Sequence, residues 1–199
     1  RSEWDGEDRL RPLDRRGRKQ ALRLIGLLDA FGVRQLTSSS SERCLQTLAP
    51  FARSAGLPVK PASLLSEEVG EDHLAGVERY VRKQAVKAAR TRVPSAVCGH
   101  RPVLPAMLAG LHIPARPMPV GCALVVHVDG DGHVVAHEFH TVAGPHIRAC
   151  HVNHGHVHAD ISDHREKTPV HPHVARSVTQ PAVETVGITH RDDRDLPGD

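Results

Sequence analysis

The stretch VRQLTSSSSERCLQT, residues 33–47, contains the junction that decides the fold. Its first part, VRQLTS at 33–38, has the composition of a short buried strand. Ser41 or a neighbouring residue is a favourable helix N-cap, and apolar residues then recur at helical spacing over 42–55. We therefore predict a strand that runs directly into a helix, which is the repeating unit of an α/β sheet.

The same alternation of elements continues on both sides of this junction. Apolar residues with a period near 3.6 predict helices over 14–31 and 74–91, and 103–111 is helix-like. The apolar run at 95–99 indicates another buried strand, whereas the prolines in 58–65 indicate a strand at the sheet edge. The order of these elements is typical of an α/β domain.

A hairpin gives the clearest local signal in the chain. The segments CALVVHV (122–128) and HVVAHEF (133–139) flank the turn sequence DGDG, which predicts two antiparallel strands. Residues 1–140 are thus expected to form a three-layer α/β sandwich with this antiparallel pair at the end of the sheet. Residues 141–199 hold nine of the sixteen histidines and no sustained period, so we expect an irregular, disordered tail.

Composition limits the class of protein. A chain of 199 residues with 39% hydrophobic content can build one sizeable core. The four cysteines form no C-x-x-C pair, so buried, reduced thiols are expected. Aromatic residues make up only 3%, which leaves little for base stacking despite a net charge of +3, so we expect no nucleic-acid partner.

The chain has no signal-like run and no stretch of eighteen apolar residues, so we expect a cytoplasmic protein without a membrane partner. Its first residue is Arg1 and not Met, which suggests a fragment of a longer protein.

Two strand-to-helix junctions carry the residues best suited to chemistry, because ligands collect at the carboxyl ends of strands in such sheets. Arg43 stands at a helix start, where a guanidinium and backbone N–H groups can bind a phosphate together. His100 follows a strand of small residues and could donate to the same anion. Glu67 lies between them and could protonate a leaving oxygen if its pKa were raised. Taken alone, each residue is better explained as an ordinary surface or turn residue.

Four motifs, in order, resemble those of the histidine phosphatase superfamily, which has the phosphoglycerate mutase-like fold. Residues 11–21, RPLDRRGRKQA, are similar to Leu-Thr-x-x-Gly-x-x-Gln-Ala, and 38–47, SSSSERCLQT, to Ser-Ser-Pro-x-x-Arg-Ala-x-Gln-Thr. LSE at 65–67 is similar to Leu-x-Glu, and VCGHRPVLP at 97–105 to the strand-then-His motif. The stretches WDGEDRLRPLD (4–14) and GHRPVLP (99–105) look most like the phosphatase-like domain that bacteria fuse behind a MutT-type Nudix domain.

This resemblance implies a phosphohydrolase that works through a phosphohistidine intermediate without a metal or other cofactor. It implies that Arg43 clamps the phosphoryl oxygens, that His100 is a second histidine of the pocket and that Glu67 is the general acid. The substrate would be a phosphorylated small molecule, and the MutT-type fusions imply nucleotides, including oxidised guanine nucleotides. A Nudix domain would then precede this chain.

One part of the family pattern has no match. The family's nucleophile is a histidine in an Arg-His-Gly or Arg-His-Ala triplet at the end of the first strand, upstream of the first matching motif, and this chain holds no such triplet. We therefore expect a sheet without its first central strand and a chain that is inactive alone. Buried N–H and C=O groups left unpaired cost about 1–3 kcal/mol each, so we also expect the chain to be poorly stable or rearranged. A substitute nucleophile would have to lie at the end of a central strand. We do not expect that position for His73, His112 or His127.

The tail offers a function of a different class. HVNHGHVHADISDH at 151–164 holds five histidines and two aspartates, which suit Zn, Ni or Cu. The alternative is therefore a non-catalytic remnant with a metal-binding tail. The tail has no H-E-x-x-H motif and no Cys/His spacing of a zinc finger that would support metal binding. A disordered tail, or a segment translated out of frame, would have the same composition.

Overall fold

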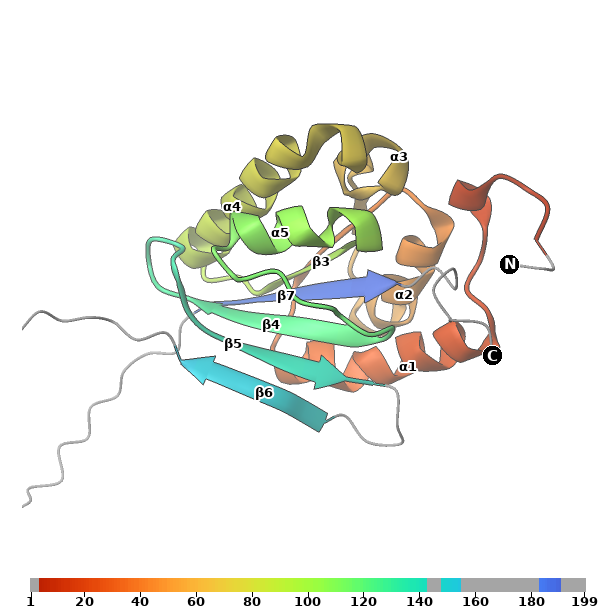
Figure 1. Ribbon diagram of the computed structural model, residues 1–199. Helices are drawn as coiled ribbons and strands as arrows, with labels where there is room; N and C mark the ends of the chain where they lie inside the picture. Colours follow the sequence, from red (N-terminus) through yellow and green to blue (C-terminus); the bar gives the residue numbers. More distant parts are fainter. Residues whose placement is uncertain (1–3, 143–147, 155–182, 191–199) are drawn as a thin grey trace, which may run out of the picture.

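The computed structural model describes residues 4–142, 148–154 and 183–190 (Figure 1). Seven strands form one sheet in the order β2-β1-β3-β7-β4-β5-β6. The strands are β1 Gln35–Ser38, β2 Val59–Pro61, β3 Ser95–His100, β4 Cys122–Val128, β5 Val134–Thr141, β6 Arg148–His154 and β7 Val183–His190. The helices are α1 Arg15–Ala30, α2 Glu42–Ala55, α3 Glu67–Gly70, α4 Leu74–Thr91 and α5 Leu104–Gly110.

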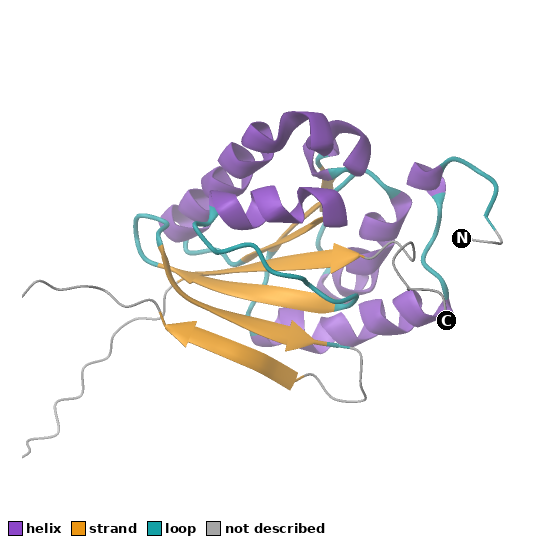
Figure 2. Cartoon of the chain, in the orientation of Figure 1, coloured by secondary structure: helices purple, strands orange, loops and turns teal. Residues whose placement is uncertain are grey.

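Helices cover both faces of the sheet, with α1 and α2 on one side and α4 and α5 on the other (Figures 1 and 2). Side chains of β3 alternate between the two layers, because Ala96 and Cys98 pack with α1 and α2 whereas Val97 packs with α4 and α5. The expected three-layer α/β sandwich is confirmed. No helix in the described part of the chain is long and apolar enough to cross a membrane.

Local sequence signals account for most element boundaries. Asp14 caps α1, because its carboxylate accepts a hydrogen bond of 2.6 Å from the Gly17 N–H. Ser41 is the N-cap residue of α2, as predicted, and Gly56 ends that helix in the left-handed region at φ 66°. The proline-containing strand β2 lies at an edge of the sheet, also as predicted.

The centre of the sheet differs from the sequence-based expectation. Strand β7 lies between β3 and β4, parallel to β3 and antiparallel to β4, so the position expected to be empty is filled. The backbone groups of β3 and β4 therefore have a partner strand, and the expected cause of poor stability is not present. Five of the eight residues of VETVGITH are β-branched, which suits a buried strand.

Two strands, β6 and β7, come from the segment expected to be an irregular tail. Strand β6 pairs with β5 and extends the antiparallel end of the sheet. Most of the histidine-rich stretch, from residue 155 onward, lies outside the described residues.

Candidate functional site

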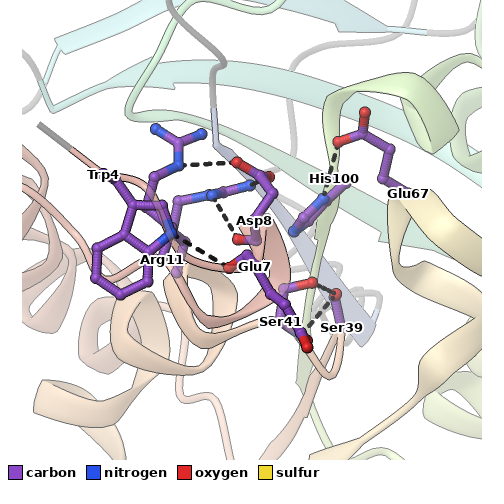
Figure 3. Close-up of polar contacts among 9 residues, drawn as sticks. Trp4, Glu7, Asp8, Arg11, Ser39, Ser41, Glu67 and His100 are labelled. Atoms are coloured by element: carbon purple, nitrogen blue, oxygen red, sulfur yellow. Dashed lines mark hydrogen bonds and ion pairs between the residues drawn. The ribbon is translucent and has the colours of Figure 1, made fainter. Parts of the chain in front are cut away.

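The candidate site lies at the carboxyl ends of β1 and β3, where the chain turns into α2 (Figure 3). The Ser39 N–H donates a 2.7 Å hydrogen bond to the Cys98 carbonyl and so ties the two strand ends together. The Ser39 hydroxyl accepts a bond of 3.2 Å from the Ser41 N–H. This serine turn redirects the chain, and it places Arg43 in the first turn of α2 beside the sheet edge.

Arg43 is almost fully buried, with 4% of its surface exposed. Its Nη2 donates to Asp8 Oδ2 at 2.7 Å and its Nη1 donates to the Asp8 carbonyl at 3.0 Å. A buried guanidinium needs an anionic partner, because an unpaired buried charge is strongly destabilising. The Asp8 carboxylate supplies that partner in this structure.

Asp8 is held by a second arginine as well. Arg11 Nε donates to Asp8 Oδ1 at 3.0 Å (Figure 3). The Asp8 carboxylate therefore lies between the guanidinium groups of Arg11 and Arg43. Partial burial acts to raise the pKa of Asp8, but the hydrogen bonds and charges of Arg43 and Arg11 outweigh it and lower the pKa to about 2. Two converging guanidiniums around one oxyanion are also an arrangement that binds phosphate.

Asp8 and Arg11 were not predicted to be site residues. Asp8 meets Arg43 across 35 positions of the chain, and no periodicity or spacing rule reports such a contact. Their only signal in the sequence is that both lie in WDGEDRLRPLD, residues 4–14, one of the stretches that carry the family resemblance.

His100 and Glu67 meet at the same edge, as their joint prediction requires. His100 Nδ1 lies 3.7 Å from Glu67 Oε2, and Glu67 is the first residue of α3 (Figure 3). His100 is 3% exposed, and its Nε2 has no hydrogen-bond partner among the described residues. A buried nitrogen of this kind costs about 1–3 kcal/mol, which a ligand oxygen would recover.

The charge state of His100 suits an anionic ligand. Burial is the largest single effect and lowers the pKa of His100, but the interactions with the Cys44 sulfur and the charge of Glu68 together raise that pKa above its usual value. A raised pKa favours the imidazolium form, in which Nε2 carries a proton that a phosphoryl oxygen can accept. The nearby guanidinium of Arg43 acts in the opposite direction.

Three polar residues of the family-like motifs, Gln20, Gln46 and Thr47, form hydrogen bonds to the backbone of the chain. Gln46 Oε1 accepts a 2.8 Å bond from the Leu13 N–H and thereby fixes the segment that leads into α1. Gln20 is buried and its side-chain amide reaches the Val120 carbonyl at 3.4 Å. Thr47 donates back to the Arg43 carbonyl at 2.8 Å within α2. These contacts give all three residues structural roles in packing and capping.

Three comparisons place the chain among known proteins. Residues 6–94 match the family model described as the histidine phosphatase superfamily, branch 1, a match that includes Arg43 and Glu67 and ends before His100. An 8-oxo-(d)GTP phosphatase from Mycolicibacterium smegmatis (strain ATCC 700084 / mc(2)155) is 36% identical over 109 residues, which are 54% of this chain and 32% of that protein. The chain therefore spans about a third of the length of that relative.

The fold also has a solved counterpart. The structure of the protein histidine phosphatase SixA complexed with tungstate matches with a TM-score of 0.54 at 19% identity. The match covers 66% of this chain and 85% of that chain. At this identity the likeness concerns the fold.

Proposed function

We propose that this site binds the phosphoryl group of a nucleotide and takes part in its hydrolysis, because residues 6–94 match the model of the histidine phosphatase superfamily. The observation that carries the proposal is the pair of buried cationic groups at one sheet edge. Arg43 holds an oxyanion there already, and His100 Nε2 lies buried without a partner among the described residues. Both groups suit the equatorial oxygens of a transferring phosphoryl group.

The proposed reaction gives each residue of the site a separate task. Phosphoryl oxygens would take the place of the Asp8 carboxylate on Arg43, and His100 would donate to another oxygen. Glu67, which is partly exposed at the edge, would give its proton to the leaving oxygen as the P–O bond breaks. A histidine would accept the phosphoryl group as a phosphohistidine, and water would then attack the phosphorus and release phosphate.

The substrate class is proposed from the relative that is named for it. That protein is called an 8-oxo-(d)GTP phosphatase, and 109 residues of this chain match it at 36% identity. We propose that this chain acts on the same class, oxidised guanine nucleotides. Hydrolysis of 8-oxo-dGTP compared with dGTP by the full chain would test this choice.

Isothermal titration with tungstate, an analogue of phosphate, tests the site itself. We expect one tungstate per chain, and we expect Arg43→Ala to weaken binding at least about tenfold, equivalent to about 1.4 kcal/mol. Arg53→Ala is the matched control, because Arg53 is an exposed arginine in the last turn of the same helix. Equal binding by the two variants, or no binding by the unchanged chain, would contradict the proposal.

A further inference from the structure

One side of helix α4 carries a row of positive side chains. These side chains recur at helical spacing and are all exposed: Arg79, Arg82, Lys83, Lys87 and Arg90. Residues three and four positions apart are neighbours on a helix surface. The distance along the helix from Arg79 to Arg90 is roughly 16 Å, because each residue adds about 1.5 Å. We call these five residues the cationic strip.

The charge of the cationic strip is not neutralised by the described part of the chain. None of its five residues forms an ion pair with a described carboxylate. Arg82 Nε donates to the Gly110 carbonyl at 3.4 Å and Lys87 Nζ donates to Gln35 Oε1 at 2.9 Å, and both acceptors are neutral. Glu78 is the only acidic residue of α4. A surface with this excess of one sign attracts a partner of the opposite sign.

The cationic strip borders two hollows in the surface. A groove of about 500 Å³ runs between its side chains and has Val86 in its lining. Arg82 and Val86 also line a second hollow of about 450 Å³, between α4, the end of α5 and the turn that joins β4 to β5 (Figure 1). That turn packs closely on α4, because a Cβ added at Gly132 would lie 2.7 Å from the Val86 Cα. The second hollow has the carboxylate of Asp131 in its lining and several aliphatic residues besides Val86: Leu111, Ile113, Pro114, Val134 and Val135.

This combination of cations and aliphatic surface favours an acidic protein segment over a nucleic acid. Proteins that bind single strands combine positive charge with aromatic side chains for base stacking. Among the described residues, no Phe, Tyr or Trp lines either hollow. An aliphatic hollow accepts an apolar side chain, and such buried anchors supply most of the binding energy of protein interfaces. Carboxylates three and four positions apart on a partner helix have the same spacing as the cations of α4.

We propose that the cationic strip and the adjoining aliphatic hollow dock an acidic segment of a partner protein, with one apolar side chain of that segment seated in the hollow. This surface is separate from the phosphate site. Helix α4 leads into the first residue of β3, Ser95, whereas the phosphate site lies at the last residue of β3, His100. The two surfaces therefore lie at opposite ends of this strand, and docking does not depend on the proposed phosphatase activity.

Fluorescence anisotropy with the full chain tests the docking surface. The probe is a labelled, helix-forming peptide with Glu at three- and four-residue spacing and one central Leu. We expect the double variant Arg79→Glu with Lys83→Glu to bind this peptide at least about tenfold more weakly than the unchanged chain. The matched control is Arg15→Glu with Lys19→Glu, which changes the net charge equally on exposed residues four positions apart on α1. The control should bind the peptide as tightly as the unchanged chain.

Changes in the probe test the same proposal on the unchanged chain, so the answer does not depend on the folding of a variant. Replacement of the central Leu by Ala, or of the Glu residues by Gln, should weaken binding. Absence of peptide binding, or equal weakening by the two double variants, would overturn the proposal. Unchanged affinity without the Leu would show that the hollow takes no anchor and would also overturn it. Tighter binding of a labelled DNA duplex than of the peptide at the same ionic strength would assign the surface to nucleic acid instead.

Discussion

Arg43 Nη2 lies 2.7 Å from Asp8 Oδ2, so the buried guanidinium best placed to bind phosphate already holds a carboxylate of its own chain. A second bond, from Nη1 to the Asp8 carbonyl, engages the other arm of the fork. A phosphoryl group that binds Arg43 through both arms must therefore displace Asp8. The 3₁₀ turn that carries Asp8, Asp8–Leu10, has no buried residue, so little packing opposes that movement.

Asp8→Asn should therefore bind tungstate more tightly than the unchanged chain. The asparagine keeps the shape but removes the competing negative charge, and we expect a gain of up to about tenfold in affinity, or about 1.4 kcal/mol. Titration calorimetry measures this change. Glu7→Gln is the control, because the Glu7 carboxylate pairs only with the exposed side chain of Arg9 among the contacts described. Weaker binding by Asp8→Asn would show that Asp8 positions Arg43 for the anion and does not compete with it.

The same pair predicts how stability depends on pH. The pKa of Asp8 falls from 3.8 to about 2 on folding, since the two arginines outweigh the effect of burial. A carboxyl group whose pKa is depressed adds stability above its unfolded pKa and loses it as the pH falls through the folded pKa. Urea unfolding should show the unchanged chain more stable than Asp8→Asn at pH 6. This difference should shrink between about pH 4 and about pH 2. A difference that stays constant down to pH 2 would contradict the assigned pKa.

Removal of β7 should abolish cooperative folding. Truncation after residue 182 leaves β3 and β4 without the strand that pairs with both of them. Unpaired buried backbone groups cost about 1–3 kcal/mol each, so several of them exceed the 5–15 kcal/mol that stabilises a typical domain. Thermal unfolding followed by circular dichroism should lose its sharp transition. Truncation after residue 190 keeps β7 and is the control, and equal transitions in the two truncated chains would show that β7 does not support the sheet.

Glu138 links two histidines and should contribute to stability without affecting the site. Its carboxylate bonds to His127 Nε2 and to His140 Nε2, both at 2.9 Å. Burial acts to raise the pKa of Glu138, but the two histidines outweigh burial and lower that pKa. We expect Glu138→Gln to lose about 1–2 kcal/mol of unfolding free energy near pH 6. Tungstate affinity should not change, and the exposed Glu71→Gln should alter neither quantity.

Local patterns were sufficient to predict the elements around the site. The strand at 33–38 and the helix at 42–55 appear in the structure as β1 and α2, because a β-prone run, a serine N-cap and a helical period lie next to one another in the sequence. The same logic placed His100 at the end of β3, and the structure brings it within 3.7 Å of Glu67.

Two features depend on contacts between distant segments and could not be predicted in this way. VETVGITH has the β-branched residues of a strand, but it follows a long segment without periodicity, and its partner strand β3 lies about ninety positions earlier in the chain. Asp8 lies in a short turn, and its bond to Arg43 on a distant segment is what makes it a residue of the site. The composition of VETVGITH suits a strand, but only the tertiary structure shows that β3 is its partner. Likewise, only the tertiary structure shows that Arg43 is the partner of Asp8.

A crystal structure of the full chain with tungstate would test the central claim most directly. We predict tungstate oxygens within about 3 Å of the Arg43 guanidinium and of His100 Nε2. The Asp8 carboxylate should then have moved away from Arg43. Tungstate bound elsewhere on the chain, with Arg43 still holding Asp8, would contradict the account.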